Sequence, residues 1–134
     1  MYLWEGFTRW DYRTGNLLFI SGTGPTDRSP KGKVGADVSP EDAYQAARDV
    51  GLQILATAKE ALDGDLDRIV HAVKVLGMVN TAPDFLDHPK VINGCSDVMV
   101  EGLGERGRHT RSAIGFAALP HDICVEIEAT FEVK

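Results

Sequence analysis

The stretch RHTRSAIGFAALPHDICVEIEATFEVK, residues 108–134, decides the fold class of this chain. Its second half alternates between apolar and polar side chains, which is typical of a β-strand with one buried face. Its first half is strand-like too, and the Leu-Pro pair between the halves predicts that the two strands form a hairpin. The hairpin carries two charges, Arg111 and Glu126. If the loop has an even length, as with residues 119–122, both charges lie on one face, about 13 Å apart along the strands.

Upstream segments supply three further strands and two helices. The pair Ser39-Pro40, followed by two acids, is a strong helix start, because serine caps the first turn and acids complement the helix dipole. The predicted strands are 7–12, 17–21 and 68–80; the predicted helices run from Pro40 to a stop at Gly64 and from near Pro89, the second with Ile92, Cys95, Met99 and Leu103 inward. This β-β-α-β-α-β-β order predicts an α+β two-layer sandwich, a mixed β-sheet with two helices on one face.

Segment 68–80 predicts that the protein associates with itself. Apolar residues occupy both alternating sets of positions in this strand, so both of its faces are expected to be covered. One layer of helices can cover only one face of a sheet. A second copy of the chain is the simple candidate for covering the other face.

Composition limits the classes of function. The 134 residues suit one domain, 1–134, and no apolar run approaches the roughly 18 residues of a membrane span, so we expect no membrane partner. The net charge of −6 argues against a nucleic-acid partner, although residues 106–111 form a local basic cluster. Without a secretory signal we expect a cytoplasmic protein in which Cys95 and Cys124 are free thiols. Cys124 fits a small buried residue better than a nucleophile, and no motif for a metal or cofactor is present.

The charged pair in the closing strands has two interpretations. An alternating strand with several acids is typical of a solvated face, and Arg111 can be a surface ion-pair residue. The small residues Ala113, Gly115 and Ala117 favour a binding site instead, because they leave room above the sheet. His109, two residues before Arg111 on the same strand face, is a candidate acid or base, although a histidine at a strand start is typically a hydrogen-bonded surface residue.

Three stretches resemble one known family: GNLLFISG at 15–22, RSAIG at 111–115 with ALP at 118–120, and VEIE at 125–128. In this order and spacing they resemble the Rid (YjgF-type) superfamily, whose best-studied branch comprises reactive-intermediate deaminases. The runs VINGCSD at 91–97 and GRH at 107–109 resemble a divergent branch of that superfamily. The resemblance implies a fold like that of the small chorismate mutases, a homotrimer, and substrate clefts between subunits.

The resemblance also implies roles for individual residues. Arg111 matches the family arginine that grips the substrate carboxylate, for which a guanidinium fork is well suited. Glu126 matches the glutamate that positions a water, and Asn93 matches a site asparagine of the deaminating members. Ser21 and Gly22 match the segment that lines the cleft.

The resemblance also bears on how the substrate nitrogen is bound and on a tyrosine of the family that this chain lacks. Backbone groups near Gly22 and Ile114 are expected to bond the nitrogen. Deaminating members carry a tyrosine where this chain has Thr8, and a threonine hydroxyl reaches less far and has a far higher pKa. Tyr12 or Tyr2 can substitute from nearby.

The expected reaction is hydrolytic deamination of a 2-imino or enamino acid to a 2-keto acid and ammonia, with no cofactor. Arg111 orients the substrate, and Glu126 acts on the water as a general base. Three alternatives stay open. They are a non-catalytic protein that binds small carboxylates on the same trimeric scaffold, a hydrolase of a bulkier, pathway-specific enamine, and a ribonuclease, which the acidic balance disfavours.

Overall fold

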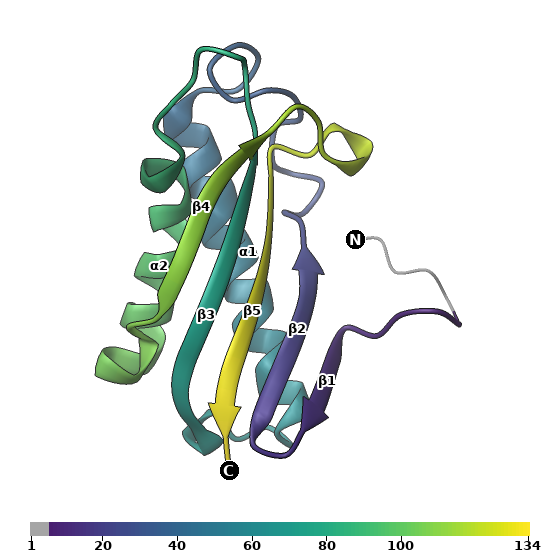
Figure 1. Ribbon diagram of the computed structural model, residues 1–134, viewed down its shortest axis with the longest axis vertical. Helices are drawn as coiled ribbons and strands as arrows, with labels where there is room; N and C mark the ends of the chain where they lie inside the picture. The colour runs from purple at the N-terminus through teal and green to yellow at the C-terminus, as the bar shows by residue number, and fades with distance from the viewer. Residues whose placement is uncertain (1–5) are drawn as a thin grey trace.

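The computed structural model describes residues 6–134 as a mixed five-stranded sheet with two helices packed on one face (Figure 1). The strand order is β1-β2-β5-β3-β4. Along the chain the elements are β1 (Asp11–Thr14), β2 (Leu17–Thr23), α1 (Pro40–Ala61), η1 (Leu66–Arg68), β3 (Ile69–Asn80), α2 (His88–Leu103), η2 (Gly104–Gly107), β4 (Thr110–Phe116), η3 (Pro120–Asp122) and β5 (Val125–Val133), where η marks a 3-10 turn. The predicted element order and α+β architecture are confirmed, but only the end of the predicted strand 7–12 belongs to β1.

The predicted closing hairpin is wrong, because β4 and β5 lie on opposite sides of β3 (Figure 1). β4 pairs with β3 in parallel, whereas β5 pairs antiparallel with both β3 and β2. A parallel pair needs a crossover, which α2 provides between β3 and β4. β5 then takes the central place, where its alternate apolar residues enter the core and both of its edges are hydrogen-bonded. β4, whose side chains are mostly exposed, forms an edge of the sheet.

The start of α1 follows the sequence prediction. The Ser39 hydroxyl accepts a hydrogen bond from the Asp42 N–H at 3.1 Å, Pro40 is the first helical residue, and two acids lie in the first turn. The last residue of the helix is Ala61. Gly64 follows with a φ of +87°, a left-handed conformation that suits glycine after a helix.

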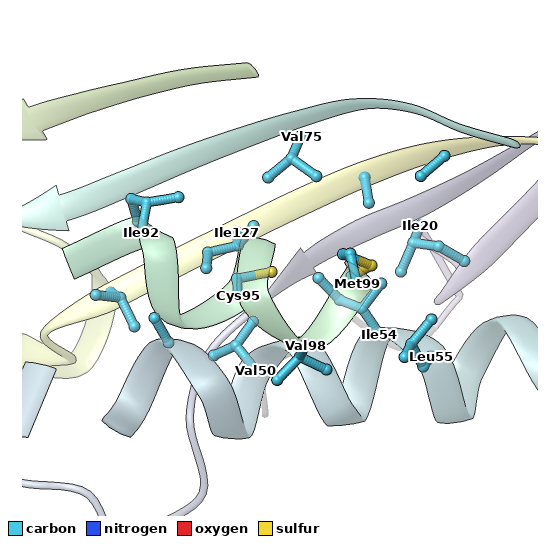
Figure 2. Close-up of a cluster of buried hydrophobic side chains, with 14 of the residues drawn as sticks. Ile20, Val50, Ile54, Leu55, Val75, Ile92, Cys95, Val98, Met99 and Ile127 are labelled. Carbon is cyan, nitrogen blue, oxygen red and sulfur yellow. The ribbon is translucent and has the colours of Figure 1, made fainter. Parts of the chain in front are cut away.

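The hydrophobic core lies between the two helices and the covered face of the sheet. Figure 2 shows Val50, Ile54 and Leu55 of α1 close to Cys95, Val98 and Met99 of α2, beneath Ile20, Val75 and Ile127 of the strands. The predicted inward residues of α2 are all buried, namely Ile92, Cys95, Met99 and Leu103. The helices approach closely at Gly94, where an added Cβ would collide with the Tyr44 carbonyl oxygen.

The other face of the sheet is open within residues 6–134, because both helices lie behind it (Figure 1). Apolar side chains reach solvent there: Tyr12 is 59% exposed, and Phe19 and Ile114 are each 43% exposed. Glu126 and Glu128 of β5 lie on this same face, since they pair with positions of β3 that point away from the core. An exposed apolar face of this kind is typical of a contact between chains.

Candidate functional site

The two predicted site charges lie on opposite faces of the sheet. Arg111 of β4 is paired with Val75, a core residue of β3, so its side chain points to the helix side. Glu126 of β5 is paired with Met78, three positions farther along β3, so its side chain points to the open face. The prediction that Arg111 and Glu126 share a face is wrong, because it assumed that β4 and β5 pair directly.

A chain of hydrogen bonds holds Arg111 against α2. The Arg111 Nη1 donates to Ser96 Oγ at 3.0 Å, and Ser96 Oγ lies 2.9 Å from His109 Nε2. The other ring nitrogen, His109 Nδ1, lies 2.7 Å from the Gly107 carbonyl oxygen. Among residues 6–134 no carboxylate forms an ion pair with Arg111. No carboxylate among the described residues therefore competes for the guanidinium, which has further N–H donors for an anion.

Sequence reasoning missed Ser96 as a site residue, although its spacing from Asn93 indicates that the two share one side of a helix. The two residues are three positions apart on α2, and such pairs lie on the same side of a helix. Asn93 is exposed and Ser96 is half-buried. Ser96 and Arg111 are in contact where α2 packs against β4, and Asn93 lies on the same side of α2 as Ser96.

The surroundings of His109 favour the neutral form of its ring. Partial burial lowers its pKa most strongly, and the nearby charges of Arg111 and His71 lower it further, while the hydrogen bond to Gly107 opposes these effects. A neutral imidazole has one donor and one acceptor nitrogen. His109 is therefore a hydrogen-bonding partner in this cluster and not a second fixed cation.

The Glu126 carboxylate occupies space that is left free by the absence of a side chain at Gly22. A Cβ at Gly22 would collide with Glu126 Oε2 and approach its Cδ at 3.2 Å. Burial raises the pKa of the half-buried Glu126 carboxyl, and the negative charge of Glu128 raises it further. Ile114 of β4 and Glu126 of β5 flank Met78 of β3 on the open face, so the structure brings these two predicted residues into one row.

Thr8 and Ser21 line a surface cavity of about 400 Å³ that Tyr12 and Glu128 also border. Ser21 is tied to the segment before β1, because its hydroxyl donates to the Arg9 carbonyl and its N–H donates to the Trp10 carbonyl at 2.9 Å. Tyr12 is thus the phenol nearest to the position of the missing tyrosine among the residues described here. The other candidate, Tyr2, lies outside the described residues.

The sequence predicted that small residues beside Arg111 leave open space above the sheet, and this holds at Gly115 and Ala117 but not at Ala113. His88 at the start of α2 lies close to Gly115, where a Cβ would collide with its ring. Ala113 packs against the core. Gly115 and Ala117 themselves line a free volume of about 400 Å³, together with Lys33, His88 and Phe116.

The described residues do not support a metal site, a membrane-spanning helix or a reactive thiol. Within 6–134 no three His, Cys, Asp or Glu side chains cluster as metal ligands would, and neither helix is long and apolar enough to cross a membrane. Cys95 and Cys124 are free, buried thiols, and burial raises their pKa values to about 12 and about 11. Neither thiol is therefore activated as a nucleophile.

Comparison with known proteins places this fold in a family. Residues 12–128 match the model of the family described as "YjgF/chorismate_mutase-like, putative endoribonuclease". The chain belongs to this family. The predicted resemblance to the Rid (YjgF-type) superfamily is thereby confirmed, together with the chorismate-mutase-like fold.

Individual members of the YjgF family agree with this assignment. The chain is 37% identical to Protein TCP17 of Trypanosoma cruzi over 125 residues, which cover 90% of this chain and 78% of that protein. It matches the crystal structure of Atu1372 from Agrobacterium tumefaciens, a protein of unknown function, with a TM-score of 0.93 and 39% identity, over 96% of this chain and 83% of that one. It matches RidA from the Antarctic bacterium Psychrobacter sp. PAMC 21119 with a TM-score of 0.64 and 27% identity, over 98% and 92% of the two chains.

Proposed function

We propose that the protein hydrolyses a small 2-imino or enamino acid to a 2-keto acid and ammonia. The observation that carries this proposal is Arg111, a cation held by neutral groups with no carboxylate partner among residues 6–134. A guanidinium in this state can form two parallel charge-assisted hydrogen bonds to a substrate carboxylate. Membership of the YjgF family, and the similarity to a protein named RidA, support the choice of substrate class.

Glu126 is the proposed general base of this reaction. Its ionised carboxylate takes a proton from water while the water oxygen bonds to the imine carbon. Protonated Glu126 passes this proton to the nitrogen, which gives a carbinolamine. The carbinolamine hydroxyl proton then moves through Glu126 to the nitrogen, the C–N bond breaks, ammonia leaves, and the carbon becomes the keto carbonyl. An enamino acid first tautomerises to the imine, as a proton moves from its nitrogen to its β-carbon. A general base such as Glu126 contributes about 10²–10⁴-fold to the rate, and a carboxyl pKa raised by burial suits it to the task.

We further propose that two chains of a homotrimer build each site. In one chain Arg111 points to the helix side of the sheet and Glu126 to the open side, so the two cannot both touch a small substrate. One chain then contributes Arg111 and Asn93, and its neighbour contributes Glu126 and Gly22. The exposed apolar side chains of the open face support a chain–chain contact there.

Two narrower alternatives rest on Thr8, which offers no phenol. A binder of small carboxylates would keep the Arg111 contact and lack the hydrolysis. A hydrolase of a bulkier enamine would use the cavity of about 400 Å³ that Thr8 and Tyr12 line. Both alternatives share the arginine, and the substrate range and the rate separate them.

The proposal is tested with freshly generated 2-iminopropionate and with 2-oxobutanoate as a binding probe. Arg111→Gln is expected to weaken 2-oxobutanoate binding about 100-fold, because two charge-assisted hydrogen bonds are lost. Glu126→Gln is expected to retain binding and to lose at least about 100-fold in the rate of ammonia release. Glu132→Gln, on the same face of β5, serves as the matched control and should alter neither quantity.

Each alternative outcome identifies a different function. Ammonia release no faster than in buffer, with 2-oxobutanoate binding that depends on Arg111, identifies the binding protein. Ammonia release from a bulky enamine but not from 2-iminopropionate identifies the hydrolase of a bulkier enamine. Binding that is unchanged by Arg111→Gln contradicts all three versions.

A further inference from the structure

The surroundings of Arg111 determine which groups donate and which accept in the hydrogen bonds around it. A carbonyl oxygen can only accept, so the 2.7 Å contact with Gly107 places the proton of neutral His109 on Nδ1. His109 Nε2 is then the bare nitrogen and must accept. The Ser96 hydroxyl, 2.9 Å away, consequently donates its proton to Nε2.

The same hydroxyl has lone pairs that can accept while its proton is engaged. The Arg111 Nη1, at 3.0 Å, donates to Ser96 Oγ. The hydrogen bonds therefore run in one direction, from the guanidinium through the hydroxyl to the imidazole and on to the Gly107 carbonyl. Because each member polarises the next, such a chain is stronger than its separate bonds.

We propose that Ser96 and His109 are positioning residues that orient Arg111 for the substrate carboxylate. This inference rests on the proposed function of Arg111 and names two further residues that serve it. A carboxylate in place of Ser96 would also orient the guanidinium, but it would compete with the substrate for the same charge. A serine–histidine pair supplies orientation without neutralising the cation.

The energetic role of the pair is preorganisation. Arginine has a long side chain, and fixing its rotamers on binding costs conformational entropy that weakens affinity. Ser96 lies on the rigid helix α2, and His109 is fixed at the entry to β4 by its bond to Gly107. The guanidinium is thus already held when the substrate arrives.

Binding of 2-oxobutanoate to four variants tests the inference. Ser96→Ala is expected to weaken binding about tenfold, because the free guanidinium must be ordered on binding. Ser96→Thr keeps the hydroxyl and is expected to restore affinity to within about twofold of the wild type. His109→Phe replaces the imidazole by a ring of similar size that cannot accept a hydrogen bond, and it is expected to weaken binding as much as Ser96→Ala does. Arg111→Gln is expected to give the largest loss of affinity.

The outcomes separate failure of this inference from failure of the proposed function. If Arg111→Gln weakens binding and Ser96→Ala does not, the positioning role is wrong while the arginine assignment stands. If Arg111→Gln has no effect, the proposed function itself is wrong. Equal loss in Ser96→Ala and Ser96→Thr also overturns the inference, since it assigns the effect to packing and not to the hydroxyl.

Nitrogen-15 NMR of the histidine rings tests the hydrogen-bond direction without any ligand. The wild type is expected to show His109 with a protonated Nδ1 and a bare Nε2, and Ser96→Ala is expected to shift the Nε2 resonance while Ser96→Thr leaves it nearly in place. A proton on Nε2 of neutral His109 contradicts the proposed chain.

Discussion

Substitution of Gly22 by alanine is expected to slow imine hydrolysis about 100-fold without weakening 2-keto acid binding. The added Cβ would collide with Glu126 Oε2, and Glu126 Cγ would lie 3.4 Å away. The carboxylate is the end of a flexible side chain and has to swing aside, by about 1 Å for an ordinary contact. A displacement of this size at a reacting group costs about 10²-fold in rate.

The fold itself should tolerate the Gly22→Ala change. The φ angle of Gly22 is not in the left-handed region, so alanine introduces no backbone strain. Replacing glycine by alanine also reduces the freedom of the unfolded chain, which stabilises by up to about 1 kcal/mol. We expect the urea midpoint of Gly22→Ala to equal or exceed that of the wild type.

A double-mutant cycle assigns the effect to Glu126. Ammonia release is measured for the wild type, Gly22→Ala, Glu126→Gln and the double variant. If the alanine acts by displacing the base, it has no further effect once the base is absent, so the losses are not additive. An equal slowing by Gly22→Ala with and without Glu126 would refute the reasoning, as would an unchanged rate in the single variant.

Three other predictions concern charge, packing and thiol reactivity. Glu128→Gln removes a negative charge that raises the pKa of Glu126. On the acid limb of the kcat/KM profile the rate falls as Glu126 is protonated, so this limb should move to lower pH in the variant. If the limb does not move, it reports the titration of a group other than Glu126. Gly94→Ala should lower the free energy of unfolding by about 1–3 kcal/mol, because the added Cβ meets the backbone of α1. Gly102→Ala, on the same helix, is the control: its Cβ meets only the end of a leucine side chain, so it should be neutral or stabilising. Urea titration of both variants at one protein concentration measures the difference. Buried Cys95, with its pKa raised to about 12, should not react with iodoacetamide at pH 8 until the protein is unfolded, and rapid alkylation of the folded protein would contradict its burial.

Local signals made most of the fold predictable from the sequence. The cap at Ser39 and the periodicity of α2 depend on neighbouring residues, and both appear in the structure as predicted. The pairing of β4 and β5 was not predictable in this way. Strands that follow one another through a short turn usually pair, but here β5 gains two hydrogen-bonded neighbours by entering between β2 and β3.

The error in pairing also explains which parts of the candidate site were missed. The strand pattern singled out Arg111 and Glu126 and the family resemblance gave them roles, but their placement on opposite faces follows only from the position of β3 between them. Ser96 has no motif of its own, because a serine within a helix is ordinarily a surface residue. Only its spacing from Asn93 and its contact with Arg111 distinguish it.

The most direct test of a site shared between chains is complementation between two inactive variants. Arg111→Gln and Glu126→Gln chains are co-expressed with different tags, and oligomers that contain both are purified. If the two residues of a site come from neighbouring chains, a mixed trimer has one intact site in three, so random mixing restores about a quarter of wild-type ammonia release before purification and about a third after it. Verified mixed oligomers that remain as inactive as the separate variants would contradict the account.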